Sequence, residues 1–292
     1  MQHYIAYGAV VLLWSTTPLA IQFSNSSFDF ATAVSLRMII AFVVAFAALG
    51  LFRFSMPLNG QAIKSYFAAS LGIFPAMPLV YWAAQYISSG LVAVLFGVMP
   101  FAVGVFSYIL YRENIFTRRK TLALVLAVVG IGIIFSDQLT VSADSVYGIA
   151  GVLLSTAFFA ISALWTKQIG AQVGALPQTV GALGFSLPSF ALLWLLVGSS
   201  LPEQVEEKSM MSIAYLAIVG SVFGFTLYFY IVKKFTAQSV SLITLITPVL
   251  ALAFGSLFAN EAFSMVMLLG GGLVMVALVF YQNISFLRLF NR

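Results

Sequence analysis

The chain has 292 residues, of which 62% are hydrophobic and only 7% are charged, and its formal net charge is +5. A soluble domain carries about 25% charged residues, so this chain cannot cover a water-facing surface. Long apolar runs recur from end to end, and the mean hydropathy is +1.08. The composition therefore predicts an all-α integral membrane protein with no domain outside the bilayer.

Ten membrane spans can be drawn along the chain, each long enough to cross about 30 Å of hydrocarbon at 1.5 Å per residue. They cover residues 4–22, 29–52, 64–84, 88–111, 118–136, 146–167, 175–197, 210–232, 238–259 and 263–284. The connections between them are short and carry turn-forming residues. The first run lacks a basic leader and a cleavage-like motif, so we expect a retained span rather than a signal peptide.

Two stretches of this chain share one layout at a distance of 148 residues. Pro100 corresponds to Pro248, and a glutamate follows each proline thirteen residues later, at Glu113 and Glu261. The first spans of the two halves correspond at an offset of 145, where Trp14 matches Phe159. We therefore predict two five-helix repeats, residues 1–142 and 143–292, which together form one transport domain. Five crossings per repeat place the second copy upside down in the membrane.

The basic residues predict the orientation. With the N-terminus in the cytoplasm, eleven of the thirteen lysines and arginines fall on the cytoplasmic side, which is the bias that orients membrane proteins. They are Arg53, Lys64, Arg112, Arg118, Arg119, Lys120, Lys167, Lys233, Lys234, Arg288 and Arg292. Both termini of this multi-pass protein are thus expected in the cytoplasm. The positive charge orients helices and does not indicate nucleic-acid binding.

The sequence lacks the residue types that several kinds of catalysis and metal binding require. The chain has no cysteine, and its one histidine is His3, which excludes disulfides, thiol catalysis and zinc sites. No acidic residue is predicted to lie deep in a span, so the paired carboxylates and metal ligands of an intramembrane enzyme are also missing. We therefore expect no enzyme activity, no metal and no cofactor.

Polar and aromatic side chains inside otherwise apolar spans are the candidate substrate-binding residues. They are Trp14, Thr17, Arg37, Tyr81, Trp82, Gln85, Ser162, Trp165, Tyr228, Tyr230, Thr244 and Thr247. Two readings stay open for each aromatic or hydroxyl residue, because rings also form interfacial belts and hydroxyls also bond neighbouring backbone.

Arg37 is the one charged residue well inside a predicted span. An arginine at the centre of a membrane helix costs on the order of 2.5–3.5 kcal/mol. It either snorkels or bonds the carbonyls of a broken helix, or it faces a cavity and receives a substrate carboxylate or phosphate. Sequence alone leaves both readings open.

Prolines and the two paired glutamates are the candidate hinge and gating residues. Pro75, Pro78, Pro100 and Pro248 each remove a helical hydrogen bond, so they produce either a hinge or a static kink. Glu113 and Glu261 either titrate during transport or hold helix ends by hydrogen bonds. A run of glycines at 270–272 is expected to permit close helix packing.

These features together resemble the EamA-type transporters of the drug/metabolite transporter superfamily. The resemblance rests on the tryptophan of the first span, on 83–89 (AAQYISS) leading to Pro100, and on 232–237 (VKKFTA) leading to Pro248 and 260–262 (NEA). It covers essentially the whole chain. It implies ten helices, cytoplasmic termini, a central cavity lined by both repeats, and transport of small metabolites, commonly as export of amino acids.

The function predicted is that of a secondary transporter that moves small polar or amphipathic metabolites by alternating access. Export of amino acids or related compounds across the inner membrane is the leading interpretation. The alternatives are a carrier of nucleosides, organic cations or sugar phosphates, and a membrane scaffold or receptor that transports nothing. The expected partners are a small-molecule substrate and the lipid bilayer, and the protein is expected to be a monomer or a weak homodimer.

Overall fold

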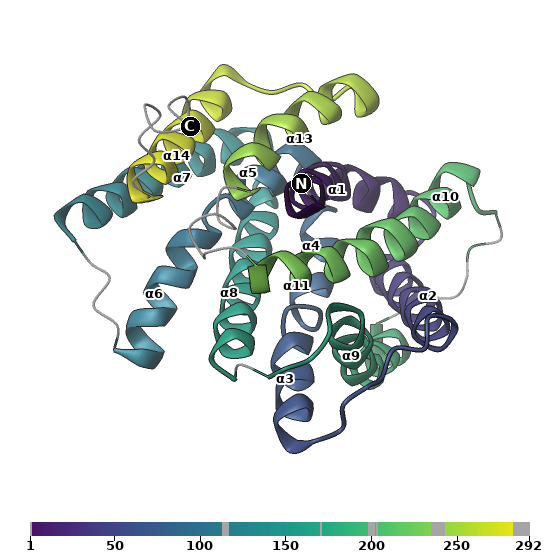
Figure 1. Cartoon of the computed structure of the whole chain (residues 1–292). Helices are drawn as coiled ribbons and strands as arrows, with labels where there is room; N and C mark the ends of the chain where they lie inside the picture. The colour runs from purple at the N-terminus through teal and green to yellow at the C-terminus, as the bar shows by residue number, and fades with distance from the viewer. Residues whose placement is uncertain are drawn as a thin grey trace.

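The structure, a computed structural model of the chain, describes residues 2–112, 117–169, 171–197, 202, 204–234 and 243–282. Within them, residues 2–4, 138–141, 233–234, 244–245 and 282 are described by their backbone alone. Every regular element in these ranges is a helix, as Figure 1 shows.

The first half of the chain forms seven of the labelled helices. They are α1 (Gln2–Ser24), α2 (Phe30–Leu51), α3 (Gly60–Ser70), α4 (Ala76–Ala83), α5 (Ser89–Phe96), α6 (Met99–Tyr111) and α7 (Arg118–Val141). The third and fourth predicted spans are each divided in two. Pro75 precedes α4 and Pro100 lies in the first turn of α6, because proline cannot donate the hydrogen bond that would continue the preceding helix.

The second half forms the remaining described helices. They are α8 (Ser145–Ile169), α9 (Ala175–Val197), α10 (Glu207–Tyr215), the π-helical η1 (Leu216–Phe223), α11 (Gly224–Lys234), α13 (Ile243–Ala259) and α14 (Met265–Gln282). The stretch from α10 through η1 to α11 is continuous, so the eighth predicted span contains a π-helical segment that its sequence did not indicate.

Seven helical stretches of the described chain are long and apolar enough to cross a membrane. They are Ile5–Ser24, Phe30–Leu51, Ser89–Tyr111, Arg118–Asp137, Ser145–Ile169, Ala175–Val197 and Glu207–Val232. The apolar helices Ile246–Ala259 and Met265–Tyr281 are shorter, and 60–83 is interrupted at 71–75. The protein is therefore a multi-pass, all-helical membrane protein over the part that is described.

Polar side chains begin several of these helices. The Asp29 carboxylate accepts hydrogen bonds from the amides of Ala31 and Thr32, both at 3.0 Å, at the start of α2. Asn59 accepts from the Ala62 amide at 2.9 Å at the start of α3. These caps satisfy amide groups that have no partner inside the helix. The short polar connections in the sequence therefore mark helix starts.

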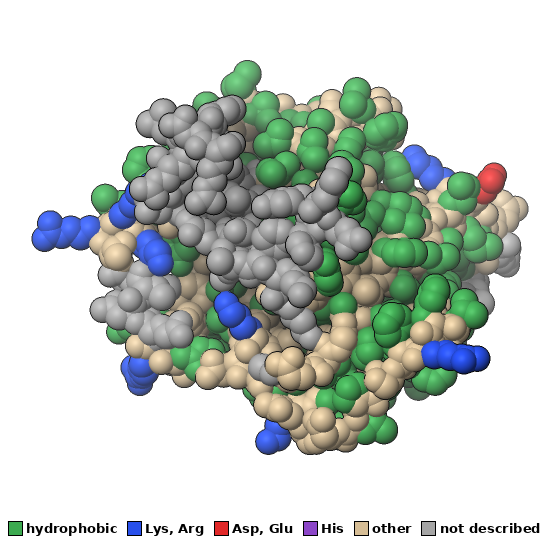
Figure 2. Space-filling model, in the orientation of Figure 1, with side chains coloured by type: hydrophobic (Ala, Val, Ile, Leu, Met, Phe, Trp, Pro, Cys, Tyr) green, Lys and Arg blue, Asp and Glu red, His purple; other side chains and the backbone are tan. Residues whose placement is uncertain are grey.

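The helices pack around one large core in which Met38, Tyr81, Leu183, Phe190 and Leu216 are fully buried. In this core α1 packs on α10, α11 and α13, α2 packs on α9 and η1, and α8 packs on α3, α4 and α6. Large apolar side chains also point outward, as expected where lipid is the solvent. Figure 2 shows them on one face of the molecule, with most of the lysines and arginines of that face toward its edge.

The helices α7 and α14 lie side by side and meet through two glycines (Figure 1). A Cβ atom on Gly130 would lie 2.8 Å from the carbonyl oxygen of Gly270, and a Cβ on Gly270 would lie 2.8 Å from that of Gly130. The two backbones therefore touch, which is how small residues stabilise helix pairs in lipid. In contrast, Gly132 and Gly272 face open space.

This contact gives a test of the packing with matched controls. Gly130→Ala and Gly270→Ala should each destabilise the protein by about 1–3 kcal/mol, because the added methyl group forces the helices apart. Gly132→Ala and Gly272→Ala should leave stability unchanged or slightly higher. Thermal unfolding of the four purified variants in detergent measures the difference, and equal midpoints for all four would contradict this packing.

Candidate functional site

A cavity of about 90 Å³ lies among α1, α2, α4, α5, α6, α8, η1, α11 and α13. Its lining residues are Trp14, Thr17, Pro18, Ile21, Arg37, Met77, Val80, Ala93, Phe96, Met99, Phe159, Gly220, Phe225 and Thr247. One water needs roughly 10–15 Å³ on this measure, so the cavity has room for about six waters or one small organic molecule. Both halves of the chain contribute to its wall.

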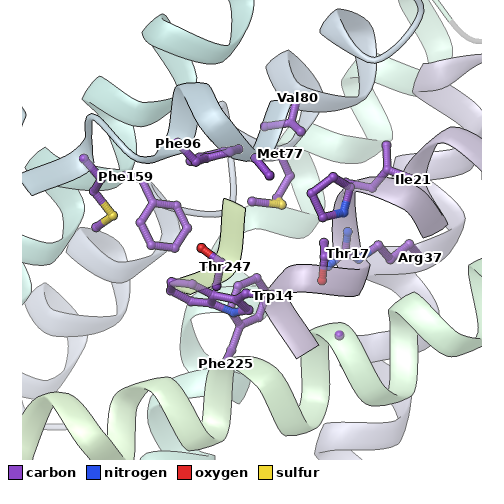
Figure 3. A pocket seen from close by; sticks show the side chains of 14 residues that line it. Trp14, Thr17, Ile21, Arg37, Met77, Val80, Phe96, Phe159, Phe225 and Thr247 are labelled. Carbon is purple, nitrogen blue, oxygen red and sulfur yellow. The ribbon is translucent and has the colours of Figure 1, made fainter. Parts of the chain in front are cut away.

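Two of the polar side chains of this main cavity lie together at one end, and the Thr247 hydroxyl lies nearer the other. In Figure 3, Arg37 and Thr17 lie together on one side, and Phe159 lies on the opposite side. Most of the remaining lining side chains are apolar, and four of them are aromatic. The cavity is therefore amphipathic, with one cationic end and an apolar body.

Arg37 is 1% exposed, and its guanidinium has few partners. Its Nε donates to the Ser221 hydroxyl at 2.9 Å, and its Nη1 donates to the Tyr81 hydroxyl at 3.4 Å. The guanidinium carbon also lies 5.8 Å from the centre of the Tyr81 ring, within cation–π range. A guanidinium has five N–H donors, so most of them are unused by the described residues.

The π-helical turn of η1 brings the backbone close to this arginine. A Cβ on Gly220 would lie 3.4 Å from Arg37 Nη2 and 3.9 Å from the Thr17 hydroxyl. Nη2 thus lies next to Gly220 in the cavity wall, and the next residue, Ser221, supplies the acceptor for Nε. Single π-helical turns are frequent at functional sites, and here the turn positions a buried cation.

An aromatic boundary separates the main cavity from a second cavity of about 20 Å³. Phe159 and Phe225 line both cavities. The rings of Trp14, Phe159 and Tyr228 contact one another, with centroid distances of 5.2 Å for Trp14–Tyr228 and 5.9 Å for each ring to Phe159. Ser162 lines the second cavity and donates to the Ala68 carbonyl at 2.8 Å. Movement of these rings would join the two spaces.

Glu261 forms a clamp between the two halves. Its carboxylate accepts from the backbone amides of Ser89, at 2.8 Å, and Gly90, at 3.1 Å, which are the first residues of α5. A Cβ on Gly255 would collide with this carboxylate, and a Cβ on Gly90 would lie 2.7 Å from the Leu252 side chain. A negative charge at a helix N-terminus is favourable, so Glu261 stabilises close contact between α5 and α13. We call this contact the Glu261 clamp.

The structure brings together about half of the predicted binding residues. Trp14, Thr17, Arg37 and Thr247 line the main cavity. Tyr81 is not part of the cavity wall, but its hydroxyl accepts a hydrogen bond from Arg37. Tyr228 and Ser162 line the second cavity.

Four other predicted residues lie outside both cavities. Trp82 packs against Tyr86 and Tyr147, and Gln85 is exposed and bonds the Trp82 carbonyl. Trp165 is 39% exposed and contacts Phe67, while Tyr230 packs beside the cluster around Ile231 and Ile243. Their helices turn these side chains away from the cavity, which a list of polar residues does not reveal. Glu113 and the side chain of Thr244 lie outside the described residues.

The prolines lie next to the main cavity. Met99 and Thr247, which line it, directly precede Pro100 and Pro248. Pro75 and Pro78 flank Met77 at the start of α4. Sequence reasoning did not select Pro18, which lies inside α1, lines the cavity and cannot donate to the Trp14 carbonyl. It also missed Ser221, because nothing in the sequence marked the π-helical turn.

The described residues place a cavity in the core and offer no cluster of metal ligands. They contain no group of three or more histidine, aspartate or glutamate side chains that could hold a metal ion. The site combines a buried cation, hydroxyl groups and aromatic rings, which suits recognition of a small amphipathic molecule.

Comparison with known proteins adds independent evidence. The sequence profile of the EamA-like transporter family matches residues 4–136 and again residues 146–281. An uncharacterized transporter of Archaeoglobus fulgidus is 27% identical over 95% of this chain and 98% of its own length. The uncharacterized transporter YoaV of Bacillus subtilis is 25% identical over 96% of each chain. Protein PecM of Dickeya dadantii is 28% identical over 77% of this chain and 73% of its own. A solved crystal structure superposes on 99% of both chains with a TM-score of 0.66 at 16% identity, which shows a shared fold.

The Glu261 clamp gives a test by cysteine labelling, because the chain has no native cysteine. Ala93, on α5, lines the main cavity, so Ala93→Cys reports access to it. Adding Glu261→Gln should speed labelling of this cysteine severalfold, since the amide places an NH₂ group against an N–H donor and removes the charge that favours the helix start. A thiol reagent added to purified protein measures the rate.

The control for this experiment is Glu207→Gln, because Glu207 is an exposed carboxylate in the first turn of α10. That variant should label at the parent rate. Equal rates for the Glu261 and Glu207 variants would show that the clamp does not restrict access to the cavity.

Proposed function

Because this chain belongs to the EamA-like transporter family and is thus a membrane transporter rather than an enzyme, we propose that it is a secondary carrier working by alternating access. Its proposed substrates are amino acids or related small carboxylates, exported across the inner membrane. We further propose ten crossings, cytoplasmic termini and two inverted five-helix repeats, residues 1–142 and 143–292.

The observation that carries this proposal is Arg37 in the wall of the main cavity. A guanidinium is costly inside a membrane helix, and its Nη2 has no acceptor among the described residues. Its planar fork matches a carboxylate, which can accept two parallel hydrogen bonds from it. A substrate carboxylate would therefore neutralise the charge that the described residues leave unpaired.

The arrangement of the repeats around the cavity supports alternating access. The family profile matches twice, once in each half. Three pairs of corresponding positions line the one cavity, namely Trp14 with Phe159 at an offset of 145, and Met77 with Phe225 and Met99 with Thr247 at an offset of 148. Equivalent residues that meet at one site are expected near the axis that relates inverted repeats. The main cavity is therefore the proposed substrate site.

Two closures of different chemistry flank that site. The Glu261 clamp joins α5 to α13, and the aromatic boundary of Trp14, Phe159 and Tyr228 separates the main cavity from the second one. In the proposed orientation the clamp lies on the external side and the second cavity on the cytoplasmic side. Opening one closure while the other holds would give alternating access, with Pro75, Pro78, Pro100 and Pro248 as the proposed hinges.

Exchange of labelled substrate in proteoliposomes tests this function directly. We expect counterflow of amino acids, and Arg37→Gln should nearly abolish it because the amide cannot neutralise a carboxylate. Arg37→Lys should reduce counterflow by about tenfold, since a point charge replaces a fork that donates hydrogen bonds to two carboxylate oxygens.

The matched control is Arg118→Gln, which removes an exposed arginine at the start of α7. It should retain parental counterflow. If folded, monodisperse Arg37→Gln protein transports as well as the parent, Arg37 belongs to the scaffold and the proposed site is wrong.

The energy source can be tested separately. Among the described residues no carboxylate lines the main cavity, so a proton has no acidic carrier there. Substrate-driven exchange should therefore persist when the pH gradient across the proteoliposome membrane is collapsed with an ionophore. Loss of exchange under that condition, with the substrate gradient intact, would indicate obligatory proton coupling.

A further inference from the structure

The wall of the main cavity holds a cationic group but no acidic group among the described residues, so it treats the carboxylate and the ammonium of an amino acid differently. Its cationic end holds Thr17 and Arg37, whose Nη2 lies next to Gly220 in the cavity wall. Among the described residues, none of the carboxylates belongs to the cavity wall. The site therefore offers a partner to a carboxylate and no acidic partner to an ammonium group.

The position of Arg37 makes an ammonium group unfavourable beside it. In an α-amino acid the ammonium and carboxylate share one carbon, so a carboxylate bound to the guanidinium would hold the ammonium within a few ångströms of it. Like charges at that distance repel strongly where water is scarce. The nearby Thr17 hydroxyl already donates to the Leu13 carbonyl at 2.7 Å and can offer only a neutral lone pair.

The opposite end of the cavity favours an apolar group of aromatic size. Phe96 and Phe159 lie at this end, away from Arg37, and the Thr247 hydroxyl lies beside Phe159 (Figure 3). Met77 and Met99 also line the cavity. Methionine side chains adapt to irregular shapes and contact aromatic rings favourably. Aromatic rings also pack edge to face with one another. An apolar ring or branched chain fits this end, whereas a sugar or a phosphate would lose its hydration there.

From these three features we infer that the preferred ligand is an amphipathic monocarboxylate with an apolar body and no ammonium group. The inference rests on the proposed transport function and narrows its substrate class. Arg37 receives the carboxylate, and the rings and methionines enclose the body. The matching amino acid binds more weakly because its ammonium group meets the guanidinium without an acidic partner.

Four ligands with one carbon skeleton test this inference by calorimetry on the purified full chain. They are 3-phenylpropionate, phenylalanine, 3-phenylpropylamine and 3-phenylpropanamide. We expect 3-phenylpropionate to bind at least tenfold more tightly than phenylalanine, and the amine and the amide to bind too weakly to measure. In Arg37→Gln the affinity for 3-phenylpropionate should fall at least tenfold, while Arg118→Gln should keep the parental values.

Each other outcome has a separate meaning. Phenylalanine binding as tightly as 3-phenylpropionate overturns the inference and leaves the proposed amino acid carrier intact. Tight binding of 3-phenylpropionate with no amino acid counterflow supports the inference and corrects the proposed substrate. Tightest binding of the amine would overturn the inference and the proposed role of Arg37. If folded protein binds none of the four, both the inference and the proposed site are wrong.

Discussion

Arg37 must stay charged in surroundings that disfavour charge, and many features of the site follow from that constraint. An arginine at a helix centre costs on the order of 2.5–3.5 kcal/mol. This one is stabilised by the Ser221 hydroxyl and by the Tyr81 hydroxyl and ring. The π-helical segment that carries Ser221 supplies one of these partners. A site that holds a cation in this way is prepared for an anionic ligand.

The two closures around the cavity rely on different forces. The Glu261 carboxylate accepts two hydrogen bonds from the backbone at the start of α5, so this contact is directional. It also requires a close approach of the backbones at Gly90 and Gly255. The aromatic boundary relies on ring packing, which is less directional and allows rings to turn past one another. The proposed carrier needs closures that open independently, and unlike chemistry at the two ends would allow each to respond to a different change.

Much of the fold could be predicted from the sequence because membrane spans obey strong local rules. Uncharged apolar runs of the right length must form helices in lipid, since no other structure satisfies their backbone groups without partners. Prolines correctly indicated the breaks before α4 and α6. The correspondence of Trp14 with Phe159 could also be predicted, but only the structure showed that these two rings touch. Arg37 could be selected because a charge inside a span is conspicuous.

What the sequence determined by itself was the class of protein, most of the helical segments of the described chain and the arginine inside one of them, because each depends on the properties of residues close together in the chain. The tertiary structure decided which side of each helix faces the cavity. It placed Trp14 and Thr17 inward and left Trp165 and Gln85 outside, and it brought Ser221 to Arg37 and Glu261 to Ser89. Such pairings join residues more than 150 positions apart, and they depend on the rotation and approach of whole helices, which local patterns do not specify.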